Sequence, residues 1–210
     1  MDEQQPKGRE TTVALLGAGR IGGQVARRLL AAGFGVRVWD RTVAQALPLM
    51  LEGAAVTPFP ARAAEGADIL LTLLPDEPTL WEATRGPQGA LHSLPFGAVW
   101  LQMGDIGVEH FARLRRRALG RVRFVDAPFT GSEQAAKDGE LMVFASGSES
   151  ARAAAAPLLD AIARQTLWVD HAGGGSWLKH ALGTWVSSLA EGSVERVALS
   201  AALGGGYRRP

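Results

Sequence analysis

Residues 17–22 read Gly-Ala-Gly-Arg-Ile-Gly and have the glycine spacing of a turn that holds the pyrophosphate of a dinucleotide. Gly17 would allow the tight turn, Gly19 would let the backbone approach the phosphates, and Gly22 would let a helix pack closely. The helix that starts here would offer free N–H groups to the phosphate oxygens. Asp40 follows Gly22 by 18 residues, close to the offset of roughly 20 at which an acid reaches an adenosine ribose. The spacing therefore predicts a dinucleotide site.

Two further segments could touch a substrate, because each follows a predicted strand where doubly wound sheets gather their ligands. Residues 126–132 read Asp-Ala-Pro-Phe-Thr-Gly-Ser, and residues 173–179 read Gly-Gly-Gly-Ser-Trp-Leu-Lys. Ser132 would also cap the next helix. Lys179 would stand just inside a helix start among apolar neighbours, and both surroundings disfavour an ammonium charge. Such a lysine suits proton exchange with a substrate hydroxyl or carbonyl, although a surface lysine fits the same residues.

Strand and helix patterns alternate along the chain, as in a doubly wound α/β sheet. Strands are predicted at 12–16, 35–40, 55–56, 67–74, 98–103, 122–126, 141–145 and 165–169. Helices are predicted from Ile21 to Gly33 and over 43–51, 108–119 and 150–164. From Ser176 an apolar stripe at helical spacing continues to about Leu203, which predicts one long helix. The fold class is therefore α/β, with a Rossmann-like, mostly parallel sheet followed by a long C-terminal helix.

The composition excludes several classes of protein. Hydrophobic residues make up 47% of the chain and charged residues 20%, and the net charge of +1 gives no field for nucleic acid or a membrane surface. The absence of cysteine excludes disulfides, thiolate metal sites and a cysteine nucleophile. Four histidines lie far apart in the sequence, and we predict no metal. The chain has no apolar leader and no membrane-length apolar run, so a cytoplasmic location is expected.

Five motifs in one order make the chain resemble the β-hydroxyacid dehydrogenase family, which includes 3-hydroxyisobutyrate dehydrogenases and is related to 6-phosphogluconate dehydrogenase. The motifs are residues 16–22, 38–42, 73–75, 126–132 and the glycine-rich turn before Lys179. The resemblance implies an NAD(P)-dependent dehydrogenase that moves a hydride to or from a small hydroxyl or carbonyl substrate. It also implies a division into a polar tail (1–10), a dinucleotide-binding domain (11–172) and an interdomain helix (173–210) that starts a truncated all-helical domain.

The resemblance also implies roles for individual residues. Lys179 would be the acid–base catalyst, and Thr130, Gly131 and Ser132 would bind the substrate. The cofactor would contact Gly17, Ala18, Gly19, Arg20, Ile21, Gly22, Asp40, Arg41, Thr42, Leu74 and Pro75. The apolar stripe of the long helix must be covered by a second chain or by a region missing from this sequence, and we expect a homodimer through this helix.

Asp40 and the pair that follows it favour different forms of the cofactor. Asp40 can accept a hydrogen bond from a ribose 2′-hydroxyl and would repel a 2′-phosphate, which favours NAD. Arg41 and Thr42 match the pair with which family members hold the 2′-phosphate of NADP. On balance we predict NADP, with NAD the less favoured cofactor.

Two other functions stay open. Gly183 stands where the family has an asparagine, four residues after the lysine, and Gly104-Asp105 stands where it has Ser-Thr. These departures fit a dinucleotide-binding dimerisation module with little or no catalysis. An imine reductase-like enzyme has the same architecture, although such relatives usually replace the lysine with an acid or a tyrosine. An acid at position 105 would also disfavour a negatively charged hydroxyacid as the ligand.

Overall fold

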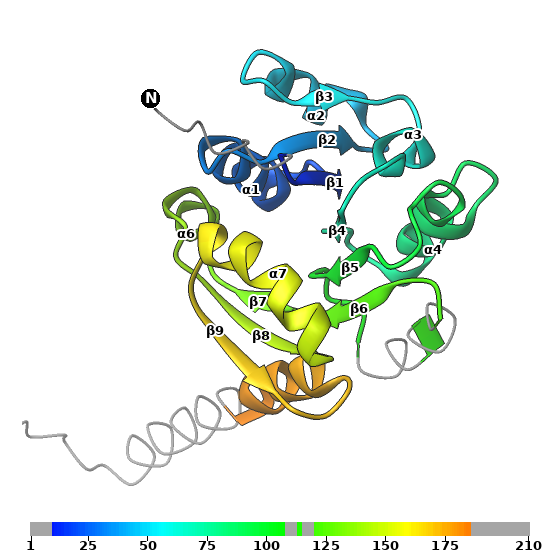
Figure 1. Cartoon of the computed structure of the whole chain (residues 1–210). Coiled ribbons are helices and arrows are strands. Elements are labelled where there is room, and N and C mark those ends of the chain that lie inside the picture. Colours follow the sequence, from blue (N-terminus) through cyan, green and yellow to red (C-terminus); the bar gives the residue numbers. More distant parts are fainter. Residues whose placement is uncertain (1–9, 108–112, 115–119, 186–210) are drawn as a thin grey trace, which may run out of the picture.

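The carboxyl ends of the strands form the edge of the sheet at which the candidate site is built. The computed structural model describes residues 10–107, 113–114 and 120–185, and nine strands of this part form one sheet. Figure 1 shows the sheet running from β3 at one end to β9 at the other. The strands are β1 (Thr12–Leu16), β2 (Gly35–Trp39), β3 (Ala55–Val56), β4 (Ile69–Thr72), β5 (Val99–Gln102), β6 (Arg123–Asp126), β7 (Phe129–Thr130), β8 (Leu141–Gly147) and β9 (Ala163–Val169).

The strand order gives the sheet a topological switch point between β1 and β4. The order is β3-β2-β1-β4-β5-β6-β8-β7, and β9 pairs with β8 off this path. Strands β1 to β6 are parallel to one another, β8 runs antiparallel to β6 and β7, and β9 is parallel to β8. Ligands of doubly wound sheets bind outside the carboxyl ends of the strands at such a switch point.

Helices cover both faces of the sheet. They are α1 (Arg20–Ala31), α2 (Val43–Met50), α3 (Pro60–Ala64), α4 (Glu77–Arg85), the short 3₁₀ helix η1 (Ala90–His92), α6 (Glu133–Asp138) and α7 (Glu149–Ile162). Buried side chains of α1, α2, α6 and α7 pack with Val13 and Leu15 of β1 in one core cluster. Those of α3, α4 and η1 pack with Ala14 and Leu16 in the other. Because both faces are covered, β1 is a continuous apolar run rather than an alternating one.

The glycine turn between β1 and α1 is compressed against the end of β4. Gly17 has φ +107°, and a Cβ built on it would lie 2.4 Å from the carbonyl oxygen of Leu73. A Cβ on Gly22 would lie 1.9 Å from the carbonyl oxygen of Gly17. No side chain fits at these distances, so both positions require glycine and the start of α1 sits directly over the turn.

The structure confirms most of the predicted elements and adds some that the sequence patterns did not predict. The strand predicted at 67–74 is shorter, because only Ile69–Thr72 pairs in the sheet. α3, α4, η1 and β7 were not predicted. The long C-terminal helix is helical over 174–185, while its predicted continuation through 186–210 lies outside the described residues. Most of the helix predicted at 108–119 also lies outside them.

We expect Gly22→Ala to lower the free energy of unfolding by at least about 2 kcal/mol, because the added methyl group overlaps the backbone of the turn. Gly183→Ala is the matched control: its Cβ would meet no atom within 4 Å, and alanine suits a helix better than glycine. Urea unfolding followed by circular dichroism measures both variants. Equal stability of Gly22→Ala and the unsubstituted chain would contradict the described turn.

Candidate functional site

A cavity of about 650 Å³ lies at the carboxyl ends of β1, β2, β4 and β5. It joins the glycine turn to the terminal helix that bears Lys179. Every residue predicted to bind cofactor or substrate lines it except Ala18 and Ser132. The lining residues that were not predicted include Gln45, Leu73, Thr79, Met103, Gly104, Asp105 and Phe129. The structure therefore brings the separately predicted segments to one cavity.

At one end of this cavity the first turn of α1 is open to an anion. Gly19 is the N-cap residue of α1 and supplies no side-chain hydrogen bond to it. A Cβ on Gly19 would meet only the Oε1 of Gln45, at 3.5 Å, so the backbone here faces open space. The N–H groups of a helix start favour phosphate oxygens, and Arg20 lines the same cavity. These features fit the pyrophosphate of a dinucleotide.

The carboxylate of Asp40 links the glycine turn to the turn between β2 and α2. Its Oδ2 accepts a hydrogen bond from the Ala18 N–H at 2.7 Å, and its Oδ1 accepts one from the Thr42 N–H at 2.7 Å. Ala18 is itself buried and lies outside the cavity lining. Each oxygen of this carboxylate therefore already accepts one backbone hydrogen bond, before any hydrogen bond from a ribose hydroxyl.

Arg41 reaches from the end of β2 to the start of α4. Its Nη1 lies 3.4 Å from the Oγ1 of Thr79, on the opposite wall of the cavity. Asp76 caps α4 by accepting from the Thr79 N–H at 2.8 Å. Hydrogen bonding to Thr79 lowers the pKa of Asp76, and the charge of Arg41 lowers it further. Leu74 and Pro75, just before this cap, complete the wall.

Of the three residues predicted to bind the substrate, two line the cavity and one does not. Thr130 and Gly131 line the cavity at the end of β7, and Gly131 has φ +147°. Ser132 instead caps α6, where its Oγ accepts from the Ala135 N–H at 3.2 Å. The capping role expected for Ser132 is therefore confirmed, and its predicted contact with a substrate stays a prediction.

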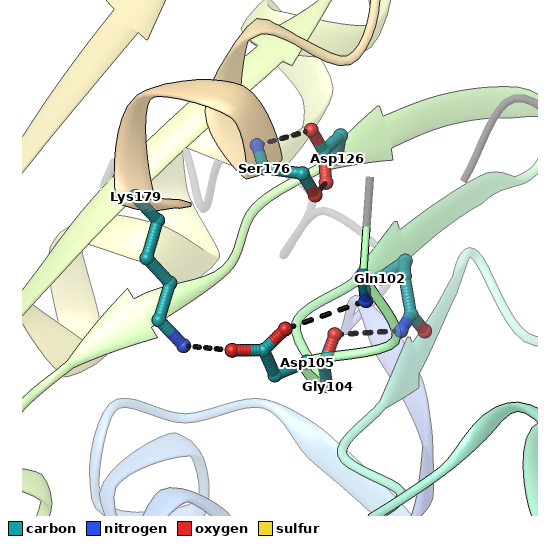
Figure 2. Close-up of polar contacts among 7 residues, drawn as sticks. Gln102, Gly104, Asp105, Asp126, Ser176 and Lys179 are labelled. Carbon is teal, nitrogen blue, oxygen red and sulfur yellow. Dashed lines mark hydrogen bonds and ion pairs between the residues drawn. The ribbon is translucent and has the colours of Figure 1, made fainter. Parts of the chain in front are cut away.

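Lys179 forms an ion pair with Asp105 across the mouth of the cavity. The Nζ of Lys179 donates to the Oδ2 of Asp105 at 2.8 Å, and it lies 5.8 Å from the ring centroid of Phe129. Figure 2 shows the two side chains meeting from the terminal helix and from the turn after β5. The hydrogen bond from Lys179 holds the pKa of Asp105 below its usual range. Apolar neighbours were expected around this lysine, and the structure places the carboxylate of Asp105 against its ammonium group as well.

The turn that carries Asp105 is fixed from below by a buried polar network. Gln102, at the end of β5, is 1% exposed, and its Nε2 donates to the carbonyl oxygen of Gly104 at 2.9 Å. Its Oε1 accepts from Thr72, whose Oγ1 also accepts from the Trp100 indole at 3.0 Å. A buried network with these partners positions the turn closely, as Figure 2 shows for Gln102 and Gly104.

Asp126 attaches the terminal helix to the sheet. The carboxylate lies at the end of β6 and accepts two hydrogen bonds from Ser176, one from the N–H at 2.7 Å and one from the Oγ at 2.7 Å. Just before the helix, the Gly173 N–H donates to the Oγ of Ser146 at 3.1 Å. Burial raises the pKa of Asp126 to about 6, against the opposing effect of the Ser176 hydrogen bonds. Lys179 follows Ser176 by one helical turn, so Asp126 sets its position.

A second cavity, of about 450 Å³, lies against the other side of the ion pair. Asp105 and Lys179 line both cavities. The second is completed by Gly107, Pro128, Ser176, His180, Gly183 and Thr184. A Cβ on Gly183 would meet no atom of the described residues within 4 Å, so these residues leave the position of the family asparagine open.

The structure gives Asp126 a role that the sequence did not reveal, and it pairs Asp105 with Lys179, a contact that the sequence did not predict. Asp126 belonged to a recognised motif, but nothing in the sequence connected it to Ser176, 50 residues later.

Among the described residues, no group of three or more potential ligands could hold a metal ion. No helix in the same part of the chain is long and apolar enough to cross a membrane.

The chain matches a known family over most of its length. The family of the NAD binding domain of 6-phosphogluconate dehydrogenase matches residues 12–170. The chain is 33% identical to the uncharacterized oxidoreductase YfjR of Bacillus subtilis (strain 168), over 73% of its own length and 54% of that protein. It is 26% identical to glyoxylate/succinic semialdehyde reductase 1 of Arabidopsis thaliana, over 87% of its length and 65% of the reductase. The chain thus spans between about half and two thirds of the length of these two relatives.

A solved structure shows the same fold. The 3-hydroxyisobutyrate dehydrogenase of Mycobacterium tuberculosis, determined with L-serine, superposes with a TM-score of 0.87 at 24% identity. The superposition covers 94% of this chain and 67% of the dehydrogenase.

The buried carboxyl of Asp126 should make stability fall as the pH rises. Its pKa is about 6 in the folded chain and 3.8 ordinarily, so the folded state binds the proton more tightly and loses this advantage between about pH 4 and pH 6. Relative to Asp126→Asn, the unsubstituted chain should lose roughly 2 kcal/mol of unfolding free energy from pH 4 to pH 7.

Denaturant unfolding at several pH values measures this difference. Asp160→Asn is the control, because Asp160 is an exposed carboxylate on α7 that lines neither of the two cavities. It should follow the pH dependence of the unsubstituted chain. A constant difference between the unsubstituted chain and Asp126→Asn across this range would show that Asp126 keeps an ordinary pKa.

Proposed function

The chain belongs to the family of the NAD binding domain of 6-phosphogluconate dehydrogenase, and on this basis we propose that it is an NADP-dependent oxidoreductase of the β-hydroxyacid dehydrogenase type. It acts on a small substrate with a hydroxyl or carbonyl group, and Lys179 is its acid–base residue. The observation that carries the proposal is the single cavity that joins the glycine turn to the ammonium of Lys179.

The residues of the cavity fit the successive parts of a dinucleotide. The start of α1 with Arg20 holds the pyrophosphate, and Arg41 and Thr42 hold the adenosine half. Leu74 and Pro75 lie along the wall toward Asp105 and Lys179, where the nicotinamide half would lie. When bound, the nicotinamide supplies or accepts a hydride, and the chain's own residues position the substrate and move the proton.

The contacts of Asp40 and Arg41 support NADP over NAD. Both oxygens of Asp40 already accept backbone N–H groups, which reduces the capacity of this carboxylate to serve a ribose hydroxyl. Arg41 lies next to it with an exposed guanidinium and lines the cavity. A guanidinium binds a phosphate group through charge-assisted hydrogen bonds, so the 2′-phosphate has a partner at this position.

Lys179 acts on the substrate oxygen. In the reducing direction its ammonium donates a proton from Nζ to the carbonyl oxygen as the carbonyl carbon becomes tetrahedral, and solvent then reprotonates the amine. In the oxidising direction the same atom accepts the hydroxyl proton. Thr130 and Gly131, on the same cavity wall, orient the substrate through the threonine hydroxyl and backbone N–H groups.

Of the two alternative functions, one has specific support. The open space at Gly183 and the exposed side chains of Trp177 (55%) and Trp185 (61%) favour a dinucleotide-binding module that dimerises through its terminal helix. An imine reductase-like activity fits the same fold, but Lys179 in the cavity argues against it. Turnover of a small aldehyde by the chain would exclude the first alternative. We also propose a homodimer through this helix for the enzyme itself.

Lys179→Ala should reduce kcat with any aldehyde substrate by 100-fold or more, the usual range for loss of a general acid being roughly 10²–10⁴. The affinity for NADPH should stay within about threefold, because Lys179 acts on the substrate rather than on the phosphates. Steady-state kinetics and a fluorescence titration measure the two effects. Lys137→Ala, on the exposed side of α6, should change neither, and an equal loss of turnover and cofactor affinity in Lys179→Ala would contradict the assigned role.

Arg41→Ala should weaken NADPH binding at least about tenfold, because a charge-assisted hydrogen bond contributes roughly 1.5–3 kcal/mol. The affinity for NADH should change less than about threefold, since NADH has no 2′-phosphate. Arg62→Ala, an exposed arginine of α3 that pairs with Glu65, is the charge-matched control. If Arg41→Ala weakened both cofactors equally, the argument for a 2′-phosphate site would fail.

A further inference from the structure

We propose that Asp105 determines substrate specificity by favouring a carbonyl compound that carries a protonated nitrogen beside the reacting carbon and disfavouring one that carries a carboxylate there. The inference rests on the proposed function in one respect only, that the substrate binds next to Lys179. It goes beyond that function because it assigns the charge of the substrate.

The carboxylate of Asp105 lies next to the place where a substrate would contact Lys179. Asp105 and Lys179 line both the large cavity and the second cavity. A carbonyl oxygen that receives the proton of Lys179 must lie within hydrogen-bond distance of its Nζ, and Asp105 is 2.8 Å from that atom. Any group attached next to the carbonyl carbon therefore comes close to the carboxylate of Asp105.

The charges around the second cavity disfavour an anion. Lys179 is the one cation among the described residues that line it, and Asp105 pairs with this cation. His180 also lines it, and the buried carboxyl of Asp126 lies behind Ser176. A substrate carboxylate would have to replace Asp105 as the partner of Lys179 and then face that displaced like charge. An ammonium group would face an acceptor instead.

Asp105 has acceptor capacity left for such a group. Its Oδ2 accepts from Lys179, whereas the one contact of its Oδ1 among the described residues is a long one, 3.4 Å from the Gly107 N–H. The side chain is 67% exposed, against 28% for Lys179. The Gln102 bond to Gly104 holds the turn in place, so the carboxylate is presented to the cavity by a fixed backbone. A lowered pKa keeps Asp105 ionised at neutral pH.

The second cavity also has room for the ammonium-bearing group of such a substrate. Gly183 lines it, and in the part of the chain that the structure describes no atom lies within 4 Å of the position of a Cβ there. An asparagine at this position would fill that space with an amide. Its replacement by glycine leaves a volume beside Asp105 in which an aminomethyl group can be accommodated.

Three aldehydes of similar size test the proposal with NADPH: aminoacetaldehyde, which carries an ammonium group, glycolaldehyde, which is neutral, and glyoxylate, which carries a carboxylate. The ratio of kcat/KM for aminoacetaldehyde to that for glyoxylate should fall at least about tenfold in Asp105→Asn. Comparing this ratio between variants cancels the different intrinsic reactivities and any general effect on Lys179. Asp160→Asn should leave it unchanged, and a ratio in Asp105→Asn within twofold of that in the unsubstituted chain would overturn the proposal.

A binding measurement separates this proposal from the proposed function. Ethanolamine and glycolate, the alcohols that correspond to aminoacetaldehyde and glyoxylate, can be titrated into the full chain without cofactor and followed by saturation-transfer NMR. Asp105→Asn should weaken ethanolamine at least about tenfold and strengthen glycolate. If no aldehyde turned over but this change in binding were observed, the proposed function would fail and the role of Asp105 would stand. Equal binding of each alcohol to both chains would reject that role.

Discussion

The attachment of the terminal helix to the sheet through Asp126 is the interaction on which the candidate site depends. The buried carboxylate accepts both the N–H and the hydroxyl of Ser176, so the first turn of the helix over 174–185 is fixed at the carboxyl end of β6. A free helix start has N–H groups that need acceptors, and a carboxylate is a strong one. Because Lys179 lies one turn further along, this bond determines where its ammonium stands relative to the glycine turn.

Two acids near Lys179 have opposite surroundings and therefore different roles. Asp126 is buried, and desolvation raises its pKa to about 6. Asp105 is largely exposed, and the hydrogen bond from Lys179 lowers its pKa. Asp126 fixes the start of the terminal helix, and Asp105 compensates the charge of Lys179 in the cavity lining. A site with this arrangement has a proton to transfer but little net charge with which to attract an anion.

The local parts of this arrangement could be predicted from the sequence, and the long-range parts could not. The apolar run of β1, the glycine spacing and Asp40 lie within 30 residues, and local rules of turn and strand formation connect them. The bond between Asp126 and Ser176 and the ion pair between Asp105 and Lys179 join residues 50 and 74 positions apart. Such contacts depend on how β5, β6 and the terminal helix pack. Asp40 illustrates the difference: its position was predicted, but its bond to Ala18 was found only in the structure.

The central claim, that this cavity holds NADP beside Lys179, is tested most directly by titrating the full chain with NADPH and with NADH and following nicotinamide fluorescence. The account predicts saturable binding of NADPH at micromolar concentrations, with NADH weaker. The open start of α1 should bind the pyrophosphate of either cofactor, and the guanidinium of Arg41 should add affinity for NADPH alone. Binding of neither cofactor would contradict the account, and it would equally contradict a dinucleotide-binding dimerisation module.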